Sequence, residues 1–190
     1  MDSLLISTGV VALAEMGDKT QLLAFILAAR FKKPLPIILG ILAATIINHG
    51  LAGALGAWIT SVIDPDVLRW ILGASFIAMA IWTLIPDKIE EEETQVAKHL
   101  GVFGATFITF FLAEMGDKTQ IATIALAAHY AAPISVVVGT TLGMLIADVP
   151  AVFVGNKFAT KVPMKLVHTI AASIFAVMGV LTLIGVDKLF

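Results

Sequence analysis

Long apolar runs alternate with short turn-forming or charged segments along the whole chain. These segments read RFKKP at 30–34, DPD at 64–66, PDKIEEEETQVAKH at 86–99, AAP at 131–133 and NKFATKVPMK at 156–165. The runs between them are long enough for helices that cross a bilayer, which need about 20 apolar residues. They predict six spans, at residues 4–29, 35–60, 68–86, 101–128, 134–155 and 166–186. Strands are disfavoured because the runs do not alternate and an open sheet edge cannot lie in lipid.

Composition supports the same class of protein. The 190 residues are 59% hydrophobic and only 14% charged, with a mean hydropathy of +0.99, whereas soluble domains are about a quarter charged. We therefore expect an integral membrane protein whose surroundings are the lipid bilayer. There is no cysteine, which excludes disulfides and thiolate metal sites. No basic stripe suggests a nucleic-acid partner.

An internal repeat organises the chain. The sequence LAEMGDKTQ occurs at 13–21 and again, unchanged, at 112–120. At the same offset of 99 residues, Pro34 matches Pro133 and Gly40 matches Gly139. Each repeat holds three spans, and an odd number forces the second copy to enter the membrane the other way up. Inverted repeats are a recurring plan of secondary transporters.

The predicted fold is therefore an all-α integral membrane protein with six transmembrane helices in two inverted three-helix repeats. Residues 1–86 form the first repeat, 87–100 a charged cytoplasmic linker and 101–190 the second repeat. Basic residues favour the cytoplasmic side of a membrane. The loops after the first, third and fifth spans hold Arg30, Lys32, Lys33, Lys88, Lys98, Lys157, Lys161 and Lys165, against Arg69 and Lys188 on the other side. This bias places both termini outside the cytoplasm.

The repeated motif places charged side chains near the middle of the first and fourth spans. A charge at mid-bilayer costs at least about 2.5–3.5 kcal/mol, so such residues usually face the protein interior and serve a function. On a helix, Glu15 and Asp18 share a face, and Glu15 and Lys19 have the spacing of an ion pair. Gly17 weakens the helix between them, and a kinked or partly unwound helix there would free carbonyl oxygens for a ligand. The second motif repeats this pattern with Glu114, Gly116, Asp117 and Lys118.

Inverted repeats would bring both motifs together at mid-membrane, near a pseudo-two-fold axis. Four carboxylates in one dry site repel one another and require protons, lysines or a cation. With both lysines charged, the two motifs carry a net charge of −2, which matches one divalent cation. Oxygen ligands suit Mn²⁺, Ca²⁺ or Mg²⁺ and argue against copper or zinc. The first-choice ligands are Glu15, Asp18, Glu114 and Asp117.

Other polar residues are second-choice ligands. This set contains Thr20, Gln21, Thr119, Gln120, Asn48 and Asp148. Lys19 and Lys118 either pair with acids or displace the cation during transport. Asp148 and its repeat equivalent His49 are candidate proton carriers, although a satisfied buried histidine is an equal alternative. A purely structural Glu–Lys staple is disfavoured by the exact duplication at mid-membrane.

The remaining features have simpler explanations. The glycine faces Gly50/Gly53/Gly56 and Gly139/Gly143 fit close helix packing. His129 and His168 lie at span ends and are assigned no role.

The doubled E-x-G-D-K-T motif, in two three-span repeats around a charged loop, resembles the Gdt family of calcium/manganese transporters. The resemblance covers essentially the full chain. It implies cation–proton or related antiport, with Glu15, Asp18, Glu114 and Asp117 at the ion site. The short chain is similar to small bacterial manganese exporters of the MneA type, which favours manganese export over organellar calcium loading.

We therefore expect a secondary transporter of the bacterial inner membrane that exports Mn²⁺ in exchange for H⁺, with no cofactor and no enzymatic activity. No ATP-binding loop is present. A Ca²⁺/H⁺ exchanger is the main alternative, and a passive channel is another. An intramembrane aspartyl hydrolase is remote, because Tyr130, the only tyrosine, is followed by Ala131 rather than Asp.

Overall fold

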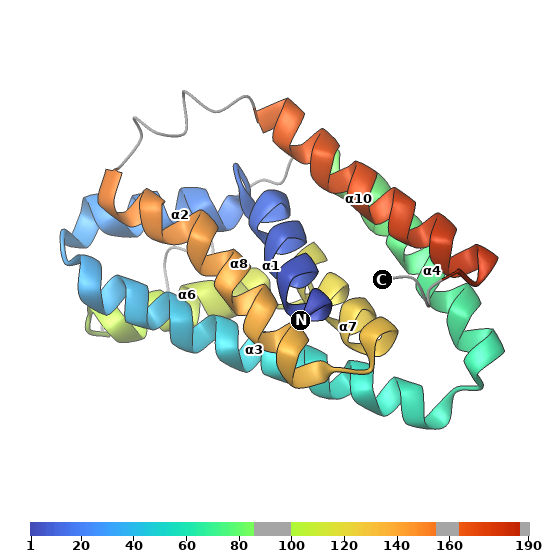
Figure 1. The fold of residues 1–190 in the computed structure, drawn as a ribbon. Helices are drawn as coiled ribbons and strands as arrows, with labels where there is room; N and C mark the ends of the chain where they lie inside the picture. The colour runs from blue at the N-terminus through green and yellow to red at the C-terminus, as the bar shows by residue number, and fades with distance from the viewer. Residues whose placement is uncertain (86–99, 155–163, 187–190) are drawn as a thin grey trace.

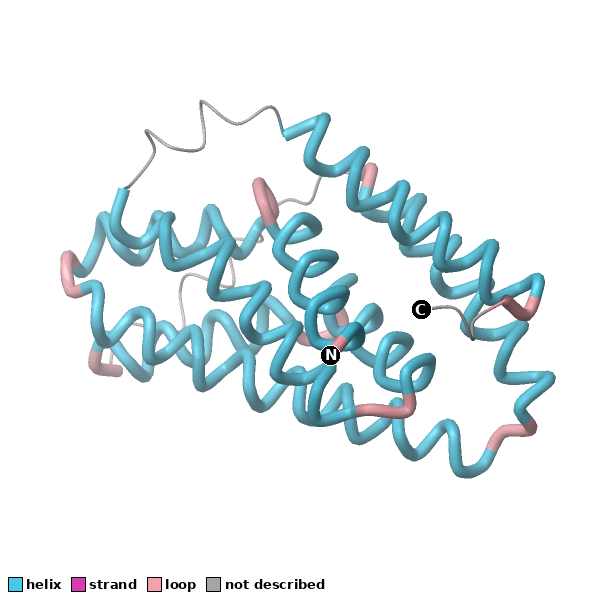
Figure 2. Tube along the Cα trace, viewed as in Figure 1, coloured by secondary structure: helices cyan, strands magenta, loops and turns pink. Residues whose placement is uncertain are grey.

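The computed structural model describes residues 1–85, 100–154 and 164–186, and in these ranges every regular element is a helix (Figures 1 and 2). The helices are α1 (Asp2–Glu15), α2 (Lys19–Phe31), α3 (Pro34–Val62), α4 (Pro65–Thr83), α6 (Val102–Glu114), α7 (Lys118–Tyr130), α8 (Pro133–Val154) and α10 (Met164–Ile184). The predicted all-α class is confirmed. The predicted linker at 87–100 lies outside the described residues except for Leu100.

The turns between helices follow the local sequence. Pro34 and Pro133 are the first residues of α3 and α8, a position where the missing proline N–H costs nothing. Asp64 caps α4, its side chain accepting a hydrogen bond from the Asp66 backbone N–H at 2.9 Å. Lys32 and Ala131, which follow α2 and α7, adopt left-handed backbone conformations that end those helices. The predicted turns at 30–34, 64–66 and 131–133 are thus confirmed.

The first and fourth predicted spans are not continuous helices. Residues 4–29 contain α1 and α2, and residues 101–128 contain α6 and α7, with a break inside the repeated motif each time. The physical cause is the backbone of Gly17 and Gly116, whose φ angles of 82° and 80° lie in the left-handed region. Figure 1 shows α1 and α2 meeting at a sharp angle. The expected kink or partial unwinding at the motif is therefore confirmed.

Within residues 1–85, 100–154 and 164–186, four helices are long and apolar enough to cross a membrane: Pro34–Val62, Pro65–Thr83, Pro133–Phe153 and Lys165–Ile184. Polarity is distributed as in a protein surrounded by lipid. Glu15, Glu114 and Asp148 are fully buried, whereas large apolar side chains such as Leu51 and Trp58 are 60% exposed. Water would favour the opposite arrangement, so the molecule's exterior fits a hydrocarbon environment.

The two halves of the chain interlock. Helix α3 of the first half packs against α6 and α7 of the second, while α8 of the second packs against α1 and α2 of the first. The closest approaches repeat at the offset of 99 residues. A Cβ on Gly40 would meet Thr106 and Phe103, and one on Gly139 would meet the equivalent residues, Ser7 and Leu4. The same kind of contact therefore occurs twice, between equivalent helices.

Helices α4 and α10 form a separate pair, packed on each other and lying beside the rest of the bundle in Figure 1. This pair contacts α1 through α10 and α7 through α4. Within the described residues, no comparable packing joins α4 to α6 or α10 to α2. Helices α4 and α10, the last helix of each half, thus cover only one side of the broken helices.

The predicted glycine packing holds for four of the five glycines. Gly53, Gly56, Gly139 and Gly143 each lie against a neighbouring helix, whereas a Cβ on Gly50 would have nothing within 4 Å. At Gly143 a Cβ would lie 2.7 Å from the Thr8 carbonyl oxygen and 2.9 Å from the Ala12 nitrogen. Both atoms belong to the backbone of α1, which cannot yield without moving the helix.

Gly143→Ala should therefore destabilise the protein by about 1–3 kcal/mol, the usual range for overpacking. Gly50→Ala is the matched control, and it should be neutral or slightly stabilising because alanine favours helix. Thermal unfolding in detergent, followed by tryptophan fluorescence, measures both. Equal melting temperatures for the two variants would contradict the assigned α1–α8 contact.

Candidate functional site

Each copy of the repeated motif ends one helix and begins the next. Glu15 is the last residue of α1, and Asp18 is the N-cap of α2, with its Oδ1 accepting a hydrogen bond from the Lys19 backbone N–H at 2.9 Å. In the second copy, Glu114 ends α6 and Asp117 caps α7. Asp favours the N-cap because its short side chain satisfies a free helix N–H. The order Glu-x-Gly-Asp therefore favours a break between two helices.

Neutral side chains satisfy the groups exposed by each break. In the first copy, the Gln21 Oε1 accepts a hydrogen bond from the Gly17 N–H at 3.0 Å, and the Thr20 hydroxyl donates to the Glu15 Oε2 at 2.6 Å. The second copy repeats both bonds, at 2.8 Å for Gly116 to Gln120 and 2.9 Å for Thr119 to Glu114. Buried backbone groups require such partners in a membrane. The threonine and glutamine of the motif thus orient the glutamate and stabilise the break.

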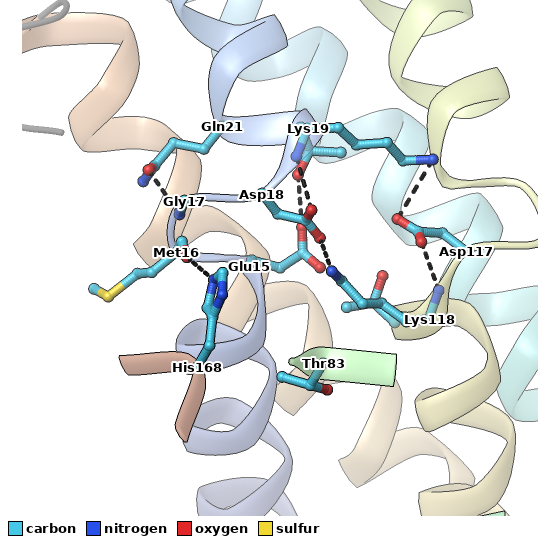
Figure 3. Close-up of polar contacts among 12 residues, drawn as sticks. Glu15, Met16, Gly17, Asp18, Lys19, Gln21, Thr83, Asp117, Lys118 and His168 are labelled. Carbon is cyan, nitrogen blue, oxygen red and sulfur yellow. Dashed lines mark hydrogen bonds and ion pairs between the residues drawn. The ribbon is translucent and has the colours of Figure 1, made fainter. Parts of the chain in front are cut away.

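Lysines and aspartates pair across the two copies rather than within them (Figure 3). The Lys118 Nζ lies 2.8 Å from the Asp18 Oδ2, and the Lys19 Nζ lies 3.6 Å from the Asp117 Oδ2. The lysine of each half therefore contacts the aspartate of the other half. This arrangement brings the two motifs together, as the sequence predicts for a single site near mid-membrane.

The two glutamates complete the cluster. Glu15 and Glu114 are both 0% exposed, and the Oε1 atom of each has no hydrogen-bond partner among the described residues. The charges of Glu114, Asp18 and Asp117 all act on Glu15. Repulsion between close carboxylates in a dry site must be offset by cations or protons. The unpaired oxygens are therefore available to a proton or a cation.

Asp148 of α8 joins this cluster. It is fully buried, neither carboxylate oxygen has a hydrogen-bond partner in the described part of the chain, and the charges of Glu15 and Asp18 act on it. The neighbouring Ala147 carbonyl accepts a hydrogen bond from the Gln21 Nε2 at 2.8 Å, which fixes α8 against α2. Asp148 is thus a fifth buried acid, held close to the first motif.

Asn48 and His49 lie on α3. The Asn48 Nδ2 donates to the Phe111 carbonyl oxygen at 3.1 Å, leaving its Oδ1 without a partner. His49 is fully buried, and neither ring nitrogen has a hydrogen-bond partner among the described residues. No bond connects His49 to the carboxylates in the described part of the chain.

His168, to which the sequence analysis assigns no role, lies at the first break. One nitrogen of its ring lies 2.7 Å from the Met16 carbonyl oxygen (Figure 3). Met16 has an extended backbone, with ψ of 118°, so its carbonyl points out of the helix. His168 is close to the start of α10, and only the tilt of that helix brings it to the motif. No sequence pattern could have indicated this contact.

The cluster gathers carboxylate oxygens, and the cations in contact with them here are ammonium groups. Among the described residues, no group of three or more His, Asp or Glu side chains has metal-ligand geometry. One reason is visible in the lysine pairs, since an Oδ2 atom of each aspartate is directed at an Nζ atom. A metal ion that approached these oxygens would meet the ammonium groups already in contact with them.

Apolar exterior, broken helices and buried acids define a multi-pass membrane transporter. A sequence model of the family described as "Divalent cation/proton antiporter GDT1" matches residues 3–91 and 102–188. A Vibrio cholerae protein named "Putative manganese exporter" is 51% identical over 96% of this chain and 90% of its own length. A GDT1-like protein 3 of Oryza sativa subsp. indica is 31% identical over 92% of this chain and 71% of its own. No solved structure matches the chain.

The chain therefore belongs to the Gdt family of divalent cation/proton antiporters. The family consists of transporters, so the remote alternative of an intramembrane hydrolase gains no support. Membership also implies that a divalent cation and protons are the transported species.

Gly116→Ala should lower the free energy of unfolding by about 1–2 kcal/mol, because a side chain with Cβ is strained at φ of +80°. Space is not limiting, since a Cβ at Gly116 would have no atom within 4 Å. Gly116→Asn should lower the free energy of unfolding by less, because asparagine tolerates the left-handed region. Chemical or thermal unfolding in detergent gives the ranking. If neither substitution changed the free energy of unfolding, the left-handed conformation assigned to Gly116 would be wrong.

Proposed function

We propose that this chain exports Mn²⁺ from the bacterial cytoplasm in exchange for protons, by alternating access at the buried carboxylate cluster. The observation that carries the proposal is the junction of two identical acidic motifs, one from each half, in the interior of an apolar helical protein. Buried acids in a membrane protein usually mark an ion pathway. The family membership and the name of the Vibrio cholerae relative support manganese as the cargo.

The proposed architecture has six crossings in two inverted repeats, at residues 1–86 and 101–190. α1 with α2 forms the first crossing, and α6 with α7 the fourth. Two observations support it. The family model matches the chain in two segments of similar length, and the contacts of Gly40 and Gly139 repeat at equivalent residues. Broken helices at mid-membrane are a common feature of transporters with inverted repeats.

In this proposal Glu15, Asp18, Glu114 and Asp117 bind the ion. Their oxygens suit a hard divalent cation. Second-choice ligands are Thr20, Gln21, Thr119, Gln120, Asn48 and Asp148. Asp148 and His49 are also proposed to carry protons, because both are buried and the residues that the structure describes give neither a hydrogen-bond partner. When the ion leaves, repulsion among the acids favours proton uptake, which couples the two fluxes.

The proposed location is the bacterial inner membrane, with both termini on the periplasmic side and the linker 87–100 in the cytoplasm. The bias of basic residues supports this orientation. In this orientation α2 and α6 form the cytoplasmic half of the broken helices, and α1 and α7 the periplasmic half.

Purified protein in liposomes should transport Mn²⁺ when a pH gradient is imposed, and a collapsed gradient should slow the flux. Glu15→Gln and Asp117→Asn should each abolish transport, because each removes a charge from the ion site. A fluorescent Mn²⁺ indicator on one side of the membrane reports the flux.

Asp64→Asn serves as the control, since this exposed residue only caps α4, and it should transport at the wild-type rate. Wild-type flux in both site variants would refute the site assignment. Downhill flux that ignores the pH gradient would instead indicate a channel.

Calcium is the alternative cargo, because an oxygen-only donor set accepts both ions and the family description names no metal. If manganese is the cargo, a tenfold excess of Ca²⁺ should reduce Mn²⁺ flux by less than about half. Strong inhibition by Ca²⁺, with Ca²⁺ itself transported faster than Mn²⁺, would favour a Ca²⁺/H⁺ exchanger.

A further inference from the structure

The two lysine–aspartate pairs occupy equivalent positions but differ in geometry. Lys118 and Asp18 are in hydrogen-bond contact at 2.8 Å, with side chains 1% and 0% exposed. Lys19 and Asp117 are separated by 3.6 Å, beyond a good hydrogen bond, and the Lys19 side chain is 17% exposed. A short, buried ion pair is difficult to break because separation leaves two uncompensated charges. The Lys19–Asp117 pair is longer, and its lysine is partly exposed although Asp117 is only 3% exposed, so it separates more readily than the Lys118–Asp18 pair.

Each lysine also contacts an aspartate oxygen that could bind a cation. Every aspartate uses Oδ1 to cap its own helix, with the Lys19 N–H at 2.9 Å and the Lys118 N–H at 2.7 Å as donors. Its Oδ2 faces the lysine of the other half. The Oδ2 atoms, which do not cap a helix, are therefore the oxygens that the ammonium groups contact.

The position of Lys19 makes its pair the accessible one. In Figure 3, Lys19 lies on the opposite side of the carboxylates from Thr83 of α4 and His168 of α10. Helices α4 and α10 pack on α7 and α1, and not comparably on α6 and α2. Lys19 is the first residue of α2, on the side that helices α4 and α10 leave uncovered. An ion arriving from that side meets Lys19 before it meets the buried acids.

We propose that Lys19 is a tethered competitor of the transported ion and must leave Asp117 for the ion to bind. Lys118 instead keeps its contact with Asp18 and holds the two halves together, while the Asp18 carboxylate also contacts the ion, because a carboxylate oxygen accepts more than one partner. This inference rests on the proposed cation transport and assigns different roles to two residues that the repeat makes identical. The returning Lys19 ammonium then helps expel the ion, because like charges repel at short range.

The charge of Lys19 therefore weakens ion binding and accelerates release. Removing that charge while keeping a polar side chain of similar length should have two opposite effects. Lys19→Gln should bind Mn²⁺ more tightly, with Kd lower by about tenfold, and should transport it more slowly at saturation. Lys19→Arg keeps the charge and should bind Mn²⁺ within about threefold of wild type.

Lys118→Gln is the matched control at the equivalent position. It leaves Asp18 buried without its partner, so the melting temperature should fall by about 10 °C. Lys118→Arg tests the same point if the glutamine variant does not fold, since it retains the charge and should recover part of the stability.

The experiment measures Mn²⁺ binding to the full-length protein in detergent, using the electron paramagnetic resonance signal of free Mn²⁺, and flux in liposomes. Tighter binding with slower flux in Lys19→Gln alone supports the inference. Unchanged or weaker binding in a folded Lys19→Gln protein overturns it, as does equal destabilisation by Lys19→Gln and Lys118→Gln. Absence of binding and flux in the wild type refutes the proposed function itself, so the two failures are distinguishable.

Discussion

The reciprocal contact between lysine and aspartate is the interaction on which the centre of the molecule depends. Lys118 reaches Asp18 and Lys19 reaches Asp117, so each half of the chain neutralises an acid of the other. Without these contacts, buried carboxylates would face one another across the junction with nothing to balance them. The pairs also determine which oxygens a cation can approach. The lysines that join the two halves and an incoming cation would therefore contact the same aspartate oxygens.

The membrane explains why the motif has its particular residue types. A break in a helix exposes backbone groups, which lipid cannot satisfy. Glycine allows the break, aspartate caps the next helix, and glutamine accepts the remaining glycine N–H, as Gly17, Asp18 and Gln21 show. Threonine then orients the glutamate. The sequence E-x-G-D-K-T-Q thus breaks the helix and supplies hydrogen-bond partners for the backbone groups at the break. The Lys and Asp side chains then interact with the other half of the chain.

Two features of the structure depart from the symmetry of the sequence. Helices α4 and α10 cover α1 and α7 but leave α2 and α6 without comparable contacts. The two ion pairs differ in length and exposure. Identical residues therefore occupy unlike environments.

The sequence by itself determined the helical class, most turns and the residues of the candidate site, because proline, aspartate and a duplicated motif act locally or through simple counting. It also indicated that the helix weakens at Gly17. It did not determine that Lys118 contacts Asp18 rather than Glu114, because helical spacing favours pairs within one motif and the break rotates the lysine away. The contact of His168 with Met16 and the exposure of Lys19 depend on how α10 and α4 lie across the bundle. Only the tertiary structure decided these, since they depend on distances between segments far apart in the chain.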